Sequence, residues 1–226
     1  NNTLYADSLT WDYGDGISST SQDTIHSHLF VNTGNTIQNF QVVLVATTDE
    51  GCASQTSKNV QVYPQPIAEF ADPGAHCSPM NILFENQSSG GSQYAWNFGN
   101  SIESALVNPS NYYTNNSDST EIYVVTLTVT STFGCTDTTS HDATIYHEPV
   151  AAFTLSESGA CVPGPVEISN QSQNADSYFW TYGDGSATQI ADSIHIHTFT
   201  NPLNGAQNYP IQLVAATTHG CTNTAN

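Results

Sequence analysis

Trp180-Thr181-Tyr182-Gly183-Asp184-Gly185 is a stretch that this chain repeats. Trp11-Asp12-Tyr13-Gly14-Asp15-Gly16 is nearly identical to it, and Trp96-Asn97-Phe98-Gly99-Asn100-Ser101 is a more divergent copy. The three tryptophans are 85 and 84 residues apart. Self-similarity at a fixed period of this size indicates tandem structural units. The chain of 226 residues is therefore organised in units of about 85 residues.

A second feature has the same period: an alternating apolar run that ends six residues ahead of a cysteine. The three copies are Phe40-Val42-Leu44-Ala46 before Cys52, Tyr123-Val125-Leu127-Val129 before Cys135, and Tyr209-Ile211-Leu213-Ala215 before Cys221. Alternation with period two predicts a β-strand that buries one face. Similar short runs, separated by clusters of Gly, Pro, Asn and Ser, fill the chain, and no segment has the pattern of a long amphipathic helix. The sequence thus predicts an all-β sandwich or barrel.

In the third unit the pattern predicts five strands in order. We expect them at Val150 to Phe153, Val166 to Ser169, Tyr178 to Tyr182, Ser193 to Phe199 and Tyr209 to Ala216.

Proline-bearing links mark the boundaries between units, at Tyr63 to Pro66 and His147 to Pro149. They predict units at residues 1–64, 65–148 and 149–226. Compared with the second unit, the first lacks its opening strands and the third lacks its closing strand, so we expect the chain to be part of a longer array. Short Pro-bearing links make semi-rigid joints. The units should therefore stack end to end as an extended rod.

The charge of the chain excludes some partners. It has 20 acidic residues, Lys58 as its one basic residue and a formal net charge of −19. Such a chain cannot bind nucleic acid by neutralising phosphates, and anionic lipid should repel it. It contains no apolar run of about 18 residues, so we expect no membrane insertion within these residues. Either the acidic residues only prevent association, or they bind divalent cations.

Five cysteines without a C-x-x-C pair point to disulfides formed in an oxidising compartment rather than to a zinc site. Pairing Cys77 with Cys135 and Cys161 with Cys221 gives loops of nearly equal size, 58 and 60 residues. Cys52 then has no partner within this chain, and we expect that partner in the missing start of the first unit. The competing interpretation makes Cys52 a reactive free thiol.

The repeated stretch offers candidate site residues, each with a structural alternative. Trp11, Trp96 and Trp180 form either the core of each unit or a platform for stacking sugars. Asp12, Asp15 and Asp184 provide hard oxygen atoms of the kind that calcium prefers, or they close turns beside glycine. Two histidine pairs at i, i+2 spacing share a strand face, which suits a metal or a structural hydrogen bond. These pairs are His26 with His28 and His195 with His197.

These motifs resemble the PKD (polycystic kidney disease) domain, whose pattern is W-D-F-G-D-G, then a His-Thr-Tyr-like triplet, then a Tyr-x-Val-x-Leu-x-Val strand. The first element is matched at Trp11 to Gly16 and Trp180 to Gly185, and the triplet at His28 to Phe30 and His197 to Phe199. The second unit departs from it, because asparagine replaces both aspartates and the histidine. The resemblance implies tandem immunoglobulin-like β-sandwiches.

The tandem array, the added cysteines and the near absence of Lys and Arg also resemble very long surface proteins of gliding bacteria. That resemblance implies export by the type IX secretion system and a position outside the cell, on the bacterial surface. The implied partners are neighbouring repeats of the same chain and surface polysaccharide or other surface proteins. The glycosylation pattern of that group, Asp-Ser/Thr before a small or aliphatic residue, is matched at Ser8, Thr24, Ser119, Thr138 and Ser193.

No catalytic motif is apparent in the sequence. It has no Ser-His-Asp set in a nucleophile turn and no H-E-x-x-H run. We therefore expect no enzymatic activity and no required cofactor, with calcium as the one ion considered. The expected function is the structural stalk of a surface adhesin or filament. The alternatives are a substrate-binding or spacer module of a secreted hydrolase, and a spacer made rigid by calcium.

Overall fold

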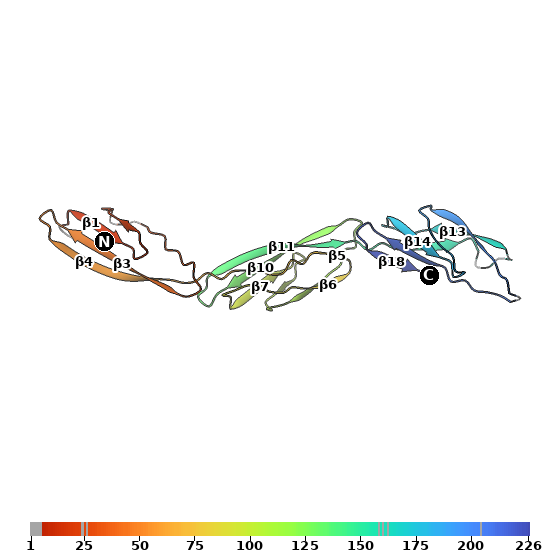
Figure 1. The fold of residues 1–226 in the computed structure, drawn as a ribbon, viewed down its shortest axis with the longest axis horizontal. Coiled ribbons are helices and arrows are strands. Elements are labelled where there is room, and N and C mark those ends of the chain that lie inside the picture. The colour runs from red at the N-terminus through yellow and green to blue at the C-terminus, as the bar shows by residue number, and fades with distance from the viewer. Residues whose placement is uncertain are drawn as a thin grey trace.

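The computed structural model of the protein describes residues 6–23, 25, 27–157, 159, 161, 163–203 and 205–226. The described residues form strands, turns and loops but no helix, so none of them could cross a bilayer as a helix. Figure 1 shows three groups of strands that follow one another along the long axis of the molecule. We call residues 8–62, 67–146 and 150–225 the first, second and third strand groups.

The described strands of the first group form one antiparallel sheet in the order β2-β1-β3-β4. Its strands are β1 (Ser8–Asp12), β2 (Ser18–Ser19), β3 (Gln38–Thr47) and β4 (Ala53–Val62). The repeated tryptophan, Trp11, lies on β1 opposite Leu44 of β3. Leu9, Tyr13 and Leu44 are buried against the sheet.

The second strand group has two layers. One is a five-stranded sheet in the order β5-β11-β10-β7-β8; the other pairs β6 with β9 and is extended by the bridges Ile67–Ser89 and Phe70–Asn86. The strands are β5 (Ala75–Cys77), β6 (Met80–Leu83), β7 (Gln93–Asn97), β8 (Glu103–Ser104), β9 (Ser110–Tyr113), β10 (Glu121–Thr130) and β11 (Thr136–Tyr146). Side chains of both layers meet in one core around Trp96.

The third strand group also has two layers, with the orders β12-β13-β16 and β15-β14-β17-β18. Its strands are β12 (Phe153–Leu155), β13 (Gly164–Asn170), β14 (Ser177–Thr181), β15 (Ala187–Gln189), β16 (Ile194–Phe199), β17 (Gln212–Ala216) and β18 (Thr222–Ala225). Trp180 lies in a core with Ile168 and Leu213, all three fully buried. Inward apolar side chains of two facing sheets are what an immunoglobulin-like sandwich requires.

The all-β class and the immunoglobulin-like sandwich predicted from the sequence are confirmed, with several differences in the third strand group. The short strand β15 was not expected. The expectation that the third unit lacks its closing strand is wrong, because β18 pairs with β17 as β11 pairs with β10. The last expected strand of the third unit begins at Gln212 rather than at Tyr209. Pro210 lies in the part that is not a strand, and proline has no N–H to donate to a neighbouring strand. Val150 makes only an isolated bridge to Gln173, and the strand begins at Phe153.

The predicted cysteine pairing is wrong. Cys77 is bonded to Cys221, with a Cα–Cα distance of 5.5 Å, whereas Cys135 and Cys161 are free thiols. Cys77 lies beside Tyr146, the last residue of β11, whereas Cys135 directly precedes the first residue of that strand. An 11-residue strand rising ~3.3 Å per residue is about 35 Å long. The cysteines at its two ends are therefore much too far apart for a disulfide. Cys52 is an exposed free thiol.

Candidate functional site

The second and third strand groups meet at a joint that contains the Cys77–Cys221 disulfide and several further contacts. The ring of Tyr146, at the end of β11, stacks on the ring of His219, with centroids 3.9 Å apart and planes 21° apart. His219 belongs to the turn between β17 and β18, two residues ahead of Cys221. The same turn thus contacts the second group through a ring stack and through a covalent bond from Cys77.

Asn223 fastens the link that connects these two groups. Its Nδ2 donates to Glu148 Oε1 at 2.8 Å, and its Oδ1 accepts from the backbone N–H of Ala151 at 3.3 Å. The two contacted residues lie on either side of Pro149. One side chain on β18 therefore orients both halves of the link.

The joint between the first and second groups has the same construction without the covalent bond. Tyr63 stacks on Phe133, with centroids 4.6 Å apart and planes 10° apart. Asp137 Oδ2 accepts from the backbone N–H of Ala68 at 2.8 Å, as Asn223 does from Ala151. Tyr63 and Phe133 hold the positions of Tyr146 and His219 in the repeat, 83 and 86 residues earlier. The two joints therefore use equivalent residues of the repeat to make equivalent contacts.

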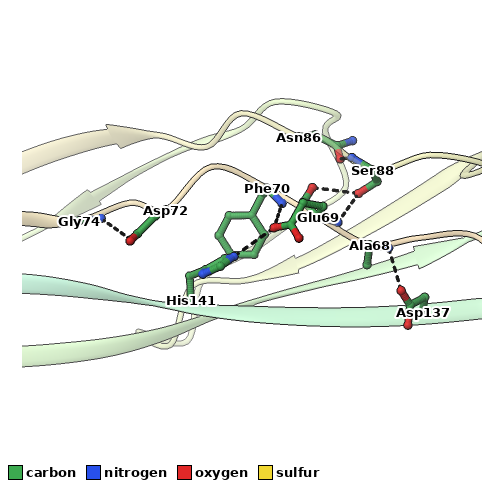
Figure 2. Close-up of polar contacts among 9 residues, drawn as sticks. All are labelled: Ala68, Glu69, Phe70, Asp72, Gly74, Asn86, Ser88, Asp137 and His141. Atoms are coloured by element: carbon green, nitrogen blue, oxygen red, sulfur yellow. Dashed lines mark hydrogen bonds and ion pairs between the residues drawn. The ribbon is translucent and has the colours of Figure 1, made fainter.

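Residues 65–77, which we call the opening segment, run along β11 from one joint to the other. Figure 2 shows Glu69 facing His141 of β11, with Glu69 Oε1 and His141 Nε2 3.2 Å apart. Phe70 is 1% exposed, and the His141 ring meets it edge to face at 4.6 Å. On its other side the segment is bonded to Ser88, whose Oγ donates to the Glu69 carbonyl at 3.1 Å. The segment is therefore held to both layers of the sandwich.

The repeated Gly-Asp-Gly turns contain a cluster of Tyr, His and Asp. In the third group the His197 ring stacks on Tyr182 at 3.8 Å, and its Nε2 donates to Asp184 Oδ2 at 2.7 Å. Burial alone would raise the pKa of Asp184, but hydrogen bonds from Ser186 and His197 outweigh it and lower the pKa to about 2. Burial raises the pKa of Tyr182 and lowers that of His195, whose Nε2 is 2.9 Å from the Tyr182 hydroxyl.

The first group repeats this cluster and the second replaces it. His28 stacks on Tyr13 at 3.8 Å, and its Nε2 donates to Asp15 Oδ2 at 2.6 Å, a hydrogen bond that lowers the pKa of Asp15. In the second group the hydroxyl of Tyr113 donates to the Phe98 carbonyl at 3.0 Å instead. The His–Asp pair is therefore one of two ways to tie this turn to the neighbouring strand.

The expected calcium ligands are engaged in the turns. Asp12, Asp15 and Asp184 each accept a hydrogen bond from the backbone N–H two residues later, at 2.9, 3.0 and 2.9 Å. This is the bond with which aspartate closes a turn. Within the described part of the chain, no group of three or more His, Cys, Asp or Glu side chains could hold a metal ion. His26 lies outside the described residues.

Two of the three tryptophans are inaccessible to a sugar, since Trp96 is 1% exposed and Trp180 is not exposed at all. Trp11 is half-buried. The predicted glycosylation positions Ser8, Ser119, Thr138 and Ser193 are exposed, and Thr24 lies outside the described residues.

A cleft of about 1010 Å³ opens in the third group, and the residues that line it include Leu155, Val166 and Asn208. Its apolar lining includes Phe199, Tyr209 and Ile211, and Cys161 also lines it. In the second group the residue that corresponds to Tyr209 is Tyr123, which pairs with Ala143 of β11.

Sequence reasoning missed Tyr146, His219 and Asn223 at the joint that holds the disulfide. It also missed the pair of Glu69 and His141 between the two joints. One signal could have identified Tyr146 and His219. Tyr63 and Tyr146 occupy the same place in the period, as do Phe133 and His219 directly before Gly-Cys. A ring at a fixed place in a repeat, outside the alternating strands, indicates a contact between units.

No family model matches the chain, and no curated protein matches it. Among solved structures, the PKD1 domain of Vibrio anguillarum Epp is 31% identical, with a TM-score of 0.31, over 37% of this chain and 96% of that domain. The PKD1 domain of the Vibrio cholerae metalloprotease PrtV is 30% identical, with a TM-score of 0.30, over 36% of this chain and 98% of that domain.

A structure of a bacterial ice-binding adhesin is 11% identical, with a TM-score of 0.34, over 99% of this chain and 85% of that one. Over a little more than a third of its length, this chain is thus similar to PKD domains of two Vibrio proteins.

Proposed function

We propose that this chain is a non-catalytic stalk built from three PKD-like units, at residues 1–64, 65–148 and 149–226. The observation that carries the proposal is the repeated joint. In both joints a tyrosine at the end of one closing strand stacks on a ring in the next unit, and a side chain of the following strand binds the backbone of the link. Repeating the same end-to-end contact at each joint produces an extended chain of units, as a stalk requires.

The chemistry of the surface supports an extracellular stalk. A disulfide persists where the surroundings are oxidising, as outside the cell. A net charge of −19 makes neighbouring molecules repel one another. Many such stalks can therefore occupy one surface without aggregating. Trypsin-like proteases have Lys58 as their one target in the whole sequence.

In its finer form, the proposal places the stalk in an adhesin or filament on a bacterial surface, exported by the type IX system. Its partners are neighbouring repeats of the same chain, and surface polysaccharide or surface proteins at the end of the array. The exposed hydroxyls of Ser8, Ser119, Thr138 and Ser193 are available for O-glycans. Mass measurement of natively secreted protein tests that part, because the bare polypeptide mass would exclude it.

Small-angle scattering tests the rod. Three units of about 35–40 Å each, from strands that rise ~3.3 Å per residue, give a length of about 110 Å and a radius of gyration of about 32 Å. A compact protein of this length has a radius of gyration of about 17 Å. We expect the larger value. The smaller one would mean that the units fold back on one another, and the proposal would fail.

Surface exposure on intact cells tests the location. An antibody against the chain should label unbroken cells of the source bacterium, and protease added outside should remove the label. A cytoplasmic protein should stay protected in the same sample as a control. Protection of this chain as well would overturn the proposed location.

A further inference from the structure

The disulfide changes the covalent path between the two ends of the chain. Cys77 and Cys221 are 144 residues apart in sequence, and their bond joins the second strand group to the third. A pull applied at the two termini runs along residues 1–77, crosses the sulfur–sulfur bond and leaves through residues 221–226. The residues between the two cysteines lie in a closed loop outside this path.

We propose that the Cys77–Cys221 bond is a tension bypass that shields most of the second and third strand groups from mechanical force. The inference deepens the proposed stalk function, because a stalk that links a cell to a surface is pulled along its length. A folded sandwich under tension unravels and lengthens several-fold. A sandwich inside a closed covalent loop cannot be lengthened by pulling on the ends of the chain.

The part of the second group that remains in the path is already nearly straight. Gln65 Nε2 donates to the carbonyl of Thr136, the first residue of β11, and Cys77 lies beside Tyr146, the last. The opening segment therefore covers the length of β11 with 12 residue steps where the strand uses 10. At ~3.3 Å per step these are about 40 and 33 Å. Tension can lengthen this segment by only about 7 Å.

The opening segment is also fastened at several points along its length, so that tension loads several bonds together. Asp137 holds the N–H of Ala68, and His141 faces Glu69 in the middle (Figure 2). Near Cys77 the Thr144 N–H donates to the Gly74 carbonyl at 3.0 Å. Ser78, the first residue of the closed loop, donates its N–H to the Tyr146 carbonyl at 2.9 Å. β5 is parallel to β11 and the pull acts along both strands. Their bonds must shear together instead of opening one by one.

Single-molecule stretching of the 226-residue chain, held at its two ends, tests the bypass. A dithiol reductant breaks the Cys77–Cys221 bond by supplying two electrons and two protons. The two cysteines become thiols, and the reductant is itself oxidised to a disulfide. Without reductant, the extension should come from residues 1–77 and 221–226 alone. With reductant, the fully extended length should increase by about 490 Å, from 144 steps at ~3.4 Å each.

Two variants make the result specific. Cys77→Ser should show the long extension without reductant. Cys135→Ser removes a free thiol at the corresponding position of the preceding unit and should stretch like the parent chain. An oxidised parent chain that already extends to the full length, or a length unaffected by reductant, would overturn the proposal.

A second measurement does not depend on how a cysteine variant folds. A protease site inserted after Leu203, which is 61% exposed, cuts inside the loop. The cut chain should keep its full mass on a non-reducing gel and separate into two fragments when reduced. Separation without reductant would contradict the bypass. Neither experiment tests whether the chain is an extended rod. That shape is tested by scattering, so the bypass and the stalk proposal can fail separately.

Discussion

The first and second strand groups contain the same repeated stretch in different surroundings. Trp96 lies between two layers and is 1% exposed, whereas Trp11 lies on a single described sheet and is half-buried. Both pair with the same strand neighbour in the repeat, Leu127 and Leu44. In both groups the stretch therefore forms the same strand and turn against the same neighbouring strand, whereas the burial of its tryptophan is greater where a second layer covers it.

The largest expected difference comes from truncating the two tryptophans. Trp96→Ala should destabilise the second group by about 3–5 kcal/mol, the usual cost of emptying a large buried site. Trp11→Ala should cost the first group less than about 2 kcal/mol, because less apolar surface is buried there. Amide hydrogen exchange of β10 and β3, measured in each variant, separates the two groups. Equal losses in both would contradict the comparison.

A smaller effect is expected at the first glycine of the turn, where the two groups should behave alike. A Cβ at Gly99 would lie 2.9 Å from the Val124 carbonyl oxygen, and one at Gly14 would lie 2.6 Å from that of Gln41, both at positive φ. Gly99→Ala and Gly14→Ala should each cost about 1–3 kcal/mol. Gly16→Ala is the control, since a Cβ there meets nothing within 4 Å, and it should cost about 1 kcal/mol. Thermal unfolding of the three variants ranks them.

Acid should separate the groups by a modest amount. The folded pKa of Asp15 is lowered from 3.8 by the hydrogen bond from His28, and the second group has Asn100 in its place. A lowered carboxyl pKa adds stability that is present above the unfolded value and is lost as the pH falls through the folded value. As the pH falls below about 4, the first group should therefore lose protection through Asp15, and the second group, with Asn100 at this position, should not.

Asp15→Asn should remove that part of the pH dependence from the first group. Asp184→Asn should do the same in the third, where the folded pKa of about 2 places the loss between about pH 4 and pH 2. Hydrogen exchange across this range checks both. A pH dependence unchanged by either substitution would mean that the His–Asp pair contributes nothing.

The smallest effect concerns the outer face of the sheet. The hydroxyls of Thr128 and Thr138 are 3.1 Å apart across β10 and β11, where the first group has Val45 opposite Gln55. Cross-strand pairs of this kind contribute about 0.2–1 kcal/mol. Thr128→Val should therefore shift the urea midpoint of the second group only slightly and leave the first group unchanged. A loss above about 1 kcal/mol would show that the pair does more than join two strands.

Much of the fold was predictable because it depends on local patterns. Alternation from Tyr123 to Val129 requires a strand with one buried face, and β10 buries Val125, Leu127 and Val129 completely. Glycine at the turn is required by a positive φ that other residues avoid. The candidate site was less predictable. Tyr146 and His219 are on different units, and no local pattern states which units touch.

What the sequence by itself determined is the unit: its period, its strands, the direction in which their side chains alternate and the turn beside each tryptophan. What only the tertiary structure decided is how units are joined. The nearly equal loops of 58 and 60 residues favoured pairing within each unit, and that choice was wrong because loop length carries no information on where the ends of a strand lie. Once β11 separates Cys77 from Cys135 by its whole length and Tyr146 stacks on His219, the sulfur within reach of Cys77 is that of Cys221.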